Sequence, residues 1–317
     1  MNIKIIPFNA VDQKTLRALW NQSYGTQFPL CQHLWESRVV SHRNFSIEHS
    51  FVAYYNNEIA GFIATKVHHD FSESKKLQGH IVLFFIPKGA SSEFVGEKLL
   101  EVLHNSFSDT AVSSIHFGKD MDHLFPGLPQ QFESLLPIFM AQGYRHEGTA
   151  YDLMHDVKYL ASFEIERKSQ YLIREAHTHD AEALQLFFNN HFPGRWAEEF
   201  SSIHKKGSPE VKFFLAFENH RIVGFCRLNA ANAHQIVGQL QWQNLYPNLM
   251  GIGPLGVIKT HEKQGIASHL IETAMAEAYR SQASHIVIDW TGHIDFYERF
   301  GFRVSQRYSA LSKTLRG

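Results

Sequence analysis

The sequence has few cysteines, little net charge and no long apolar run, and each absence excludes a class of protein. Its 317 residues include two cysteines, Cys31 and Cys226, which are too few for a disulfide framework or a cysteine zinc site. No run approaches the ~18 apolar residues that span a bilayer, and the N-terminus lacks the apolar stretch of a signal peptide. A formal net charge of −1 provides no field that would attract nucleic acid or an anionic membrane. These absences predict a cytoplasmic protein that binds neither nucleic acid nor a membrane.

The histidines and the apolar residues set two further bounds. The 21 histidines are scattered and lack the spacing of a metal site such as His-Glu-x-x-His, so we expect no metal. Hydrophobic residues make up 44% of the chain and aromatic residues 13%, which is enough to build a core in each of two domains. Cys226 lies in a predicted strand and is interpreted as a core residue.

An internal duplication organises the chain. Two apolar runs around a polar turn predict a hairpin at residues 51–62, and the same pattern returns at residues 214–225. The matched positions are Phe51, Ala53, Asn56, Ile59, Gly61 and Phe62 in the first copy and Phe214, Ala216, Asn219, Ile222, Gly224 and Phe225 in the second. We therefore predict an α/β fold made of two copies of one unit, residues 1–157 and 168–317.

Residues 250–303 carry the strongest functional signal. An apolar run interrupted by glycines and a proline, residues 250–258, predicts a strand with a bulge or a close approach to a ligand. Gly265 then opens a predicted helix, where free backbone N–H groups can converge on an anion such as a pyrophosphate. A predicted strand at residues 284–289 and a short segment that presents Tyr297 follow.

In this order, the pieces over roughly residues 170–317 resemble the GCN5-related N-acetyltransferase (GNAT) superfamily. The resemblance implies a tandem protein, a monomer or homodimer, in which each domain has a mixed, mostly antiparallel sheet flanked by helices. It also implies acetyl-CoA as co-substrate and a primary amine of a small molecule as acceptor. The implied acetyl-CoA-binding residues are Leu255, Gly256, Val257, Lys263, Gln264, Gly265, Ile266, Ala267 and Ser268. One position departs from the family pattern: Glu262 stands where Arg or Gln is usual, and its carboxylate disfavours a neighbouring pyrophosphate.

Two side chains are candidates for the proton transfers. Tyr297 takes the place of the family's acid, which protonates the departing thiolate, and the pKa of a phenol suits that role. Asp289 ends a predicted strand at the edge where the site opens, and it either orients or deprotonates the ammonium, directly or through water, or caps the following helix. His191 and His261 are weaker candidates for the base. Backbone N–H groups at a bulge around residues 255–257 are expected to meet the acyl oxygen.

The loops suggest the acceptor. Candidate acceptor-binding residues are His191, Arg195, Trp196, Trp242 and Trp290, since tryptophans can stack on a sugar ring or bind a cation. The alternative for each tryptophan, and the commoner role of a single one, is a place in the core. The segments Phe192–Trp196, Gly251–Val257 and Asp289–Thr291 are similar to those of bacterial two-domain acetyltransferases that act on glucosamine-type amino sugars. A mycothiol-synthase-like enzyme is the nearest alternative, and a non-catalytic ligand-binding scaffold is another.

The duplication also predicts which copy is active. Phe94 takes the place of Gly265 in the first copy, and a phenylalanine does not permit the tight turn that glycine allows. Phe139 takes the place of Tyr297, so the first copy lacks the hydroxyl acid. We therefore predict that residues 1–157 form a degenerate copy and that residues 168–317 form the catalytic one.

Overall fold

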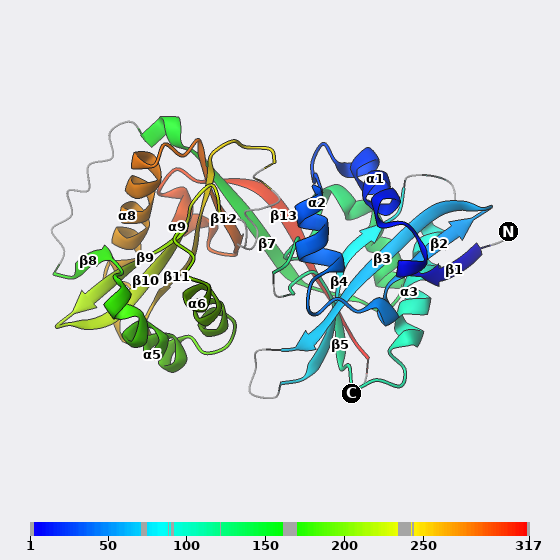
Figure 1. Ribbon diagram of the computed structural model, residues 1–317, viewed down its shortest axis with the longest axis horizontal. Coiled ribbons are helices and arrows are strands. Elements are labelled where there is room, and N and C mark those ends of the chain that lie inside the picture. The colour runs from blue at the N-terminus through cyan, green and yellow to red at the C-terminus, as the bar shows by residue number, and fades with distance from the viewer. Residues whose placement is uncertain are drawn as a thin grey trace. The chain divides into compact units, whose positions relative to one another are not determined.

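The computed structural model describes residues 3–70, 75–87, 89, 92–120, 122–160, 170–233, 242 and 244–315. The chain forms two compact units (Figure 1). The first unit consists of Met1–Ala150 together with Gln306–Gly317, and the second consists of Tyr151–Ser305. Among the described residues, no helix combines the length and apolarity that crossing a membrane requires.

The first unit is a sheet with the strand order β1-β2-β3-β4-β5-β13. The pair β4–β5 is parallel, and the other pairs along this order are antiparallel. Its strands are β1 (Ile3–Pro7), β2 (Phe51–Tyr55), β3 (Glu58–His69), β4 (Leu77–Phe85), β5 (Ser114–Phe117), the short β6 (Leu128–Pro129) and part of β13 (Arg303–Thr314). Its helices are α1 (Gln13–Tyr24), α2 (Gln32–Trp35), α3 (Ser92–Ser106) and α4 (Leu136–Ala141).

The second unit repeats this plan with the strand order β7-β12-β11-β10-β9-β8. Here the pair β11–β12 is parallel and the others are antiparallel. Its strands are part of β7 (Arg145–Asp156), β8 (Leu172–Glu175), β9 (Val211–Glu218), β10 (Arg221–Asn229), β11 (Leu249–Val257) and β12 (His285–Thr291). Its helices are α5 (Ala181–His191), α6 (Arg195–Lys206), α8 (Ile266–Arg280) and α9 (Ile294–Glu298). The predicted α/β architecture of mixed, mostly antiparallel sheets flanked by helices is confirmed.

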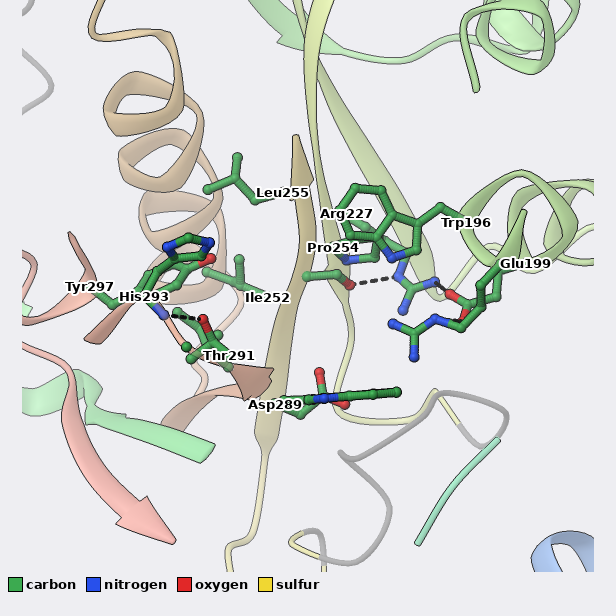
Figure 2. A pocket seen from close by; sticks show the side chains of 15 residues that line it. Trp196, Glu199, Arg227, Ile252, Pro254, Leu255, Asp289, Thr291, His293 and Tyr297 are labelled. Atoms are coloured by element: carbon green, nitrogen blue, oxygen red, sulfur yellow. Dashed lines mark hydrogen bonds and ion pairs between the residues drawn. The ribbon is translucent and has the colours of Figure 1, made fainter. Parts of the chain in front are cut away.

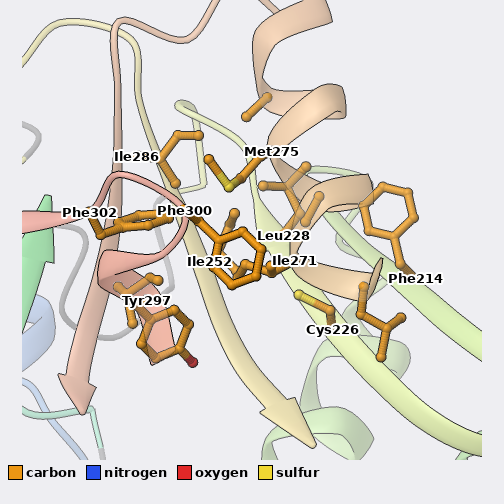
Figure 3. Packing of buried hydrophobic residues seen from close by; sticks show 14 of the residues in the cluster. Phe214, Cys226, Leu228, Ile252, Ile271, Met275, Ile286, Tyr297, Phe300 and Phe302 are labelled. Carbon is orange, nitrogen blue, oxygen red and sulfur yellow. The ribbon is translucent and has the colours of Figure 1, made fainter. Parts of the chain in front are cut away.

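The second sheet buries both faces. Successive residues of β10 point to opposite faces, so Phe225 packs with α5 and α6 while Cys226 packs with α8. The α8 cluster brings Ile271 and Met275 against β10, β11 and β12 (Figure 3). Cys226 is fully buried in this cluster, as expected for a core residue.

Both predicted hairpins form with the same turn. Asn56 and Asn57 have φ values of 50° and 66°, and Asn219 and His220 have 46° and 66°. Positive φ at both central residues is the signature of a tight two-residue hairpin, which asparagine tolerates well.

The terminal strand of each sequence copy pairs with the sheet formed by the other copy. β7 ends the first copy, but its residues from Tyr151 to Asp156 pair with β12 in the second unit. β13 ends the second copy, but its residues from Ser312 to Thr314 pair with β5 in the first unit. Both strands are 12 residues long, and each has residues in both units. The expected domains, 1–157 and 168–317, are the two sequence copies. The compact units have different boundaries, because the last strand of each copy pairs with the sheet of the other.

Candidate active site

Two bulges in the second sheet line one cavity. The pairing of β11 with β12 runs from Leu249 to Gly251, and beyond it each strand is bulged. In β11 the register against β10 shifts between Ile252 and Leu255, and in β12 the register against β7 shifts between Ile288 and Thr291. Bulges re-aim side chains and are frequent beside active sites. The cavity between them has a volume of about 270 Å³ (Figure 2).

Side chains from five elements surround this cavity. α9 presents Tyr297 on one side, and α6 and β10 present a cluster of charged groups on the other (Figure 2). The lining residues are Arg195, Trp196, Glu199, Arg227, Ile252, Gly253, Pro254, Leu255, Ile288, Asp289, Trp290, Thr291, Gly292, His293 and Tyr297.

The bulge of β11 lies earlier than the sequence suggested. It falls at Gly253 and Pro254 rather than around residues 255–257. The N–H of Ile258 donates to the carbonyl of Val223 over 2.9 Å, and alternation along the strand then turns the N–H of Gly256 toward β10. The N–H groups of Leu255 and Val257 point to the opposite edge, where β12 has separated from β11.

Gly256 is glycine because of packing. A Cβ at this position would lie 2.7 Å from the ring of Phe225 and 2.9 Å from the ring of Phe192. Neither ring could move away without disturbing the cluster beneath α5 and α6. Of the three residues expected at the acyl group, Leu255 is the one that lines the cavity.

The entry of α8 presents free backbone donors. Gly265 is the N-cap with a φ of 82°, and no side chain of a described residue caps the helix. A Cβ on Gly265 would meet nothing within 4 Å among the described residues, so the backbone angle is what requires glycine. The first intrahelical bond runs from His269 to Gly265, which leaves the N–H groups of Ile266, Ala267 and Ser268 directed out of the helix.

The side chains near this helix entry differ in their contacts. Gln264 accepts a hydrogen bond from the hydroxyl of Tyr171 and donates one to the carbonyl of Thr260, so its amide is held by the protein. Lys263 and Glu262 are exposed. His261 contacts Glu218 at 3.0 Å and does not line the cavity. The free amides, the positive φ and the exposed lysine together fit an anionic group such as a pyrophosphate.

Tyr297 is buried, with 8% of its surface exposed, at the border between the apolar cluster and the cavity. Its hydroxyl points away from Ile271 and Met275 (Figure 3). Among the described residues this hydroxyl makes no hydrogen bond. Burial, with the neighbouring Cys226 and Asp289, raises the pKa of Tyr297 above its usual value. The phenol therefore stays protonated at neutral pH.

Asp289 has an unusual acidity for a carboxyl group. Burial, reinforced by the charge of Asp152, raises the pKa of Asp289 to about 7, although Arg195 and Arg227 act in the opposite direction. The alternative role as a helix cap does not fit the structure. The N-cap of α9 is His293, whose N–H donates to the hydroxyl of Thr291 over 3.0 Å. Asp289 is thus a group that can gain or lose a proton near neutral pH.

A chain of charges forms the far wall. The guanidinium of Arg227 donates to Glu199 over 2.9 Å and to the carbonyl of Gly253 over 2.7 Å. Arg195 lies 3.3 Å from Glu199 and stacks over the ring of Trp290 at 4.5 Å. Sequence reasoning missed Glu199 and Arg227; the available signal was an arginine within the apolar strand of residues 222–228.

The predicted acceptor residues do not all meet. Arg195, Trp196 and Trp290 line the cavity. His191 is exposed at the end of α5 against Phe187. Trp242 lies in a separate buried cluster with Leu249 and Val287. The three tryptophans therefore do not converge as expected, because Trp242 fills core space. Within the described part of the chain, no three histidine, cysteine, aspartate or glutamate residues are grouped so as to hold a metal ion.

Comparison with known proteins gives a consistent result. Residues 178–302 match the model of the acetyltransferase (GNAT) family. No curated protein matches the sequence. At 20% identity and a TM-score of 0.84, the structure is similar to the GCN5-related glucosamine N-acetyltransferase region of a fungal multi-domain GH3 β-N-acetylglucosaminidase, with 98% of this chain and 38% of that chain covered. This chain thus spans 38% of the length of that protein.

Two further structures are similar over nearly their whole length. A GCN5-related N-acetyltransferase from Sphaerobacter thermophilus has a TM-score of 0.68 at 16% identity, with 99% of this chain and 96% of that chain covered. A tandem GNAT protein from the clavulanic acid biosynthesis pathway has a TM-score of 0.65 at 10% identity, with 100% and 99% covered. At such identities the likeness establishes the fold, and it confirms the predicted tandem arrangement.

Proposed function

We propose, from the premise that residues 178–302 belong to the GNAT acetyltransferase family, that this protein transfers an acetyl group from acetyl-CoA to a primary amine of a small molecule. The observation that carries the proposal is the cavity where β11 and β12 separate, because it brings Asp289 and Tyr297 together. One of these groups titrates near neutral pH and the other stays protonated.

The residues that would hold acetyl-CoA follow from the free donors. The N–H groups of Leu255 and Val257 would face the pantetheine and acyl part, and those of Ile266, Ala267 and Ser268, with Lys263, would bind the pyrophosphate. The co-substrate supplies an acetyl thioester, which is susceptible to attack by a neutral amine. Glu262 is exposed and its carboxylate would not bind an anion, so the backbone amides and Lys263 would bind the pyrophosphate.

Asp289 and Tyr297 would handle the two protons of the reaction. An amine enters largely protonated at neutral pH, and Asp289, directly or through a water, accepts a proton from its nitrogen so that the lone pair becomes available. The nitrogen then attacks the thioester carbonyl, and the C–S bond breaks as Tyr297 donates its hydroxyl proton to the departing sulfur. The second proton that the nitrogen loses on becoming an amide restores the tyrosinate to a phenol, directly or through a water. The raised pKa keeps the phenol protonated before the reaction and makes it a weaker acid, so proton transfer accompanies cleavage of the C–S bond rather than preceding it.

The cavity favours a small polar acceptor, and we propose an amino sugar. Its volume of about 270 Å³ lies just below the range of ~300–1,000 Å³ that is usual for ligand pockets. Trp196 and Trp290 offer ring faces against which a sugar can stack, and Glu199 and Arg227 offer hydrogen-bonding groups to hydroxyls. The glucosamine-acetylating region with the same fold supports this choice of class. A mycothiol-synthase-like enzyme would use the same donor with a different amine.

The decisive experiment combines calorimetry with an assay of thiol release. We expect acetyl-CoA to bind at one site per chain and glucosamine to be acetylated faster than a simple alkyl amine. Gly265→Trp should abolish acetyl-CoA binding by obstructing the entry of α8. Gly207→Trp is the matched control, since Gly207 also has a positive φ of 62° and open surroundings, but it ends α6.

The alternatives give different results. A protein that binds no acetyl-CoA would be a ligand-binding scaffold, and the proposed function would be wrong. Binding without acetylation of any amino sugar, together with acetylation of another amine, would retain the acetyltransferase and replace its acceptor class.

A further inference from the structure

Asp152 of β7 contacts the bulge that presents Asp289. Leu153 pairs with Ile288 and Tyr151 pairs with Thr291, so Asp152 alone stands opposite the two bulged residues. One oxygen of its carboxylate accepts the N–H of Trp290 over 3.1 Å, and the other accepts the indole N–H of Trp242 over 2.9 Å. Asp152 is 1% exposed, and a buried carboxylate is tolerated when both oxygens are hydrogen-bonded.

The bulge depends on an unfavourable backbone conformation. Trp290 has a φ of 47°, which is uncommon and costly for a bulky side chain. In a regular strand, consecutive residues point to opposite faces, yet Asp289 and Trp290 both line the cavity. The hydrogen bond from the Trp290 N–H to Asp152 holds the chain in the conformation that makes this possible.

The charges around Asp289 come from three elements. Arg195 and Glu199 approach from α6, Arg227 from β10 and Asp152 from β7, and Tyr297 of α9 and His293 complete the wall. Asp152 and Glu199 disfavour the charged form of Asp289, and the two arginines favour it. Asp152 contributes the larger of the two unfavourable charges.

We propose that Asp152 is a positioning residue, which fixes the β12 bulge through the Trp290 N–H and so holds Asp289 in the cavity. Its negative charge also disfavours ionisation of Asp289 and thereby strengthens it as a base. Because β7 ends the first sequence copy, that copy supplies a working part of the second unit's site. This inference rests on the proposed acetyltransferase function.

The test is Asp152→Asn, which keeps the shape of the side chain and removes its charge. We expect kcat to fall roughly tenfold or more as Asp289 loses its fixed position, with the Kd for acetyl-CoA unchanged. The acidic limb of the kcat/KM profile should move down by about one pH unit, because removal of a like charge makes Asp289 easier to deprotonate. A purely structural role would reduce activity without moving this limb.

A second readout does not depend on activity. Carboxyl 13C resonances of aspartate-labelled protein, with Asp289 assigned through Asp289→Asn, report the titration of Asp289 directly. We expect the same downward shift in Asp152→Asn. Asp156→Asn is the matched control on the same strand, since it removes a carboxylate that pairs with Lys158 at 2.6 Å, and it should move neither the limb nor the resonance.

The outcomes separate this inference from the function beneath it. If the wild-type protein acetylates no amine, the proposed acetyltransferase function is wrong. The resonance of Asp289 by itself then tests the role of Asp152. A folded Asp152→Asn in which the limb and the resonance stay in place overturns the inference. If Asp152→Asn does not fold, Trp242→Phe takes its place. This variant removes the indole N–H that binds one oxygen of Asp152, and kcat should fall several-fold. If both kcat and the titration of Asp289 stay unchanged, the inference is wrong.

Discussion

The two units share one architecture but differ at the positions that carry chemistry. Ile115 and Ile286 occupy the same register beside their parallel partners, and counting from them places Gly118 where Asp289 stands. Phe139 replaces Tyr297 and is fully buried among other rings. Phe94 lies within α3, which begins at Ser92, whereas α8 begins directly after Gly265.

Packing also differs at the end of the central strand. Phe85 stands where the second unit has Gly256, and its ring stacks on Phe62 at 4.8 Å. The hydroxyl of Tyr24 donates to the carbonyl of Ile86 over 2.7 Å, next to this position. Aromatic rings pack at this position in both units, but in the first unit the strand supplies one of them itself, whereas in the second unit the neighbouring Leu255 lines the cavity. The comparison supports the proposal that the first copy is a degenerate one whose interior serves packing.

Charged groups follow the same division. In the first unit Lys66 and Asp120, at 0% and 1% side-chain exposure, pair at 2.5 Å, and Arg38 pairs with Asp122 at 2.8 Å. In the second unit Glu199 and Arg227 also pair, but they and Asp289 line a cavity. Charged groups that face a cavity are available to a ligand, whereas a pair enclosed in the core is not.

The largest expected effect in this comparison is that of Asp289→Asn. Loss of the base should lower kcat/KM by roughly 10²- to 10⁴-fold while acetyl-CoA binding is retained. In the wild type, activity should rise as the pH increases through about 7, where Asp289 loses its proton. Steady-state kinetics over this range provides the check, and wild-type activity in Asp289→Asn would remove its assigned role.

Exchange of the matched aromatic residues should affect one unit's chemistry and the other unit's stability. Tyr297→Phe should lower kcat by roughly tenfold to hundredfold with little change in acetyl-CoA affinity, since only the donated proton is lost. Phe139→Tyr should instead reduce stability by about 1–3 kcal/mol, because a hydroxyl would be buried without a designed partner, and activity should remain. Thermal melts and turnover of both variants test the contrast, which fails if Tyr297→Phe is fully active.

Replacement of the buried cations should distinguish the two charge clusters. Lys66→Met leaves Asp120 buried and unpaired, so we expect a loss of about 3–5 kcal/mol of stability with normal kinetics in the protein that remains folded. Arg227→Met releases Glu199 and the Gly253 carbonyl beside the cavity, so KM for the acceptor should rise as well. Denaturant titration with acceptor-dependent kinetics is the measurement; an unchanged KM in Arg227→Met would argue against an acceptor role for this wall.

The smallest effect is a difference in the pH dependence of stability. Burial raises the pKa of Asp122, but the hydrogen bond to His42 and the charge of Arg38 outweigh burial and lower this pKa below its usual value. Asp122 therefore stabilises the folded state above pH ~4, and this stabilisation is lost on acidification. Asp289 has the opposite sign, because its raised pKa makes the folded state less stable as the pH rises from about 4 through 7. Asp122→Asn should flatten the acid side of the Tm profile and Asp289→Asn the neutral side, and profiles with no such difference would contradict these assignments.

The sequence by itself determined the duplication, both hairpins and the helix entry at Gly265. These are local features, since a two-residue turn of asparagines or a glycine with positive φ is set by neighbouring residues. The order of a glycine-interrupted strand, a helix, a strand and a tyrosine-bearing segment also sufficed to indicate the GNAT fold. Asp289 and Tyr297 could be selected because each follows a recognisable element.

The tertiary structure alone decided which strand completes which sheet. Nothing in β7 or β13 specifies its partner locally, because strand pairing is a long-range contact that depends on the neighbouring edge. The exchange of these strands brings Asp152 to the β12 bulge, and burial together with charges from β7, α6 and β10 sets the acidity of Asp289. The sequence left both roles of Trp242 open for the same reason: whether a tryptophan lines a cavity or fills a core, as Trp242 does, depends on residues distant in sequence.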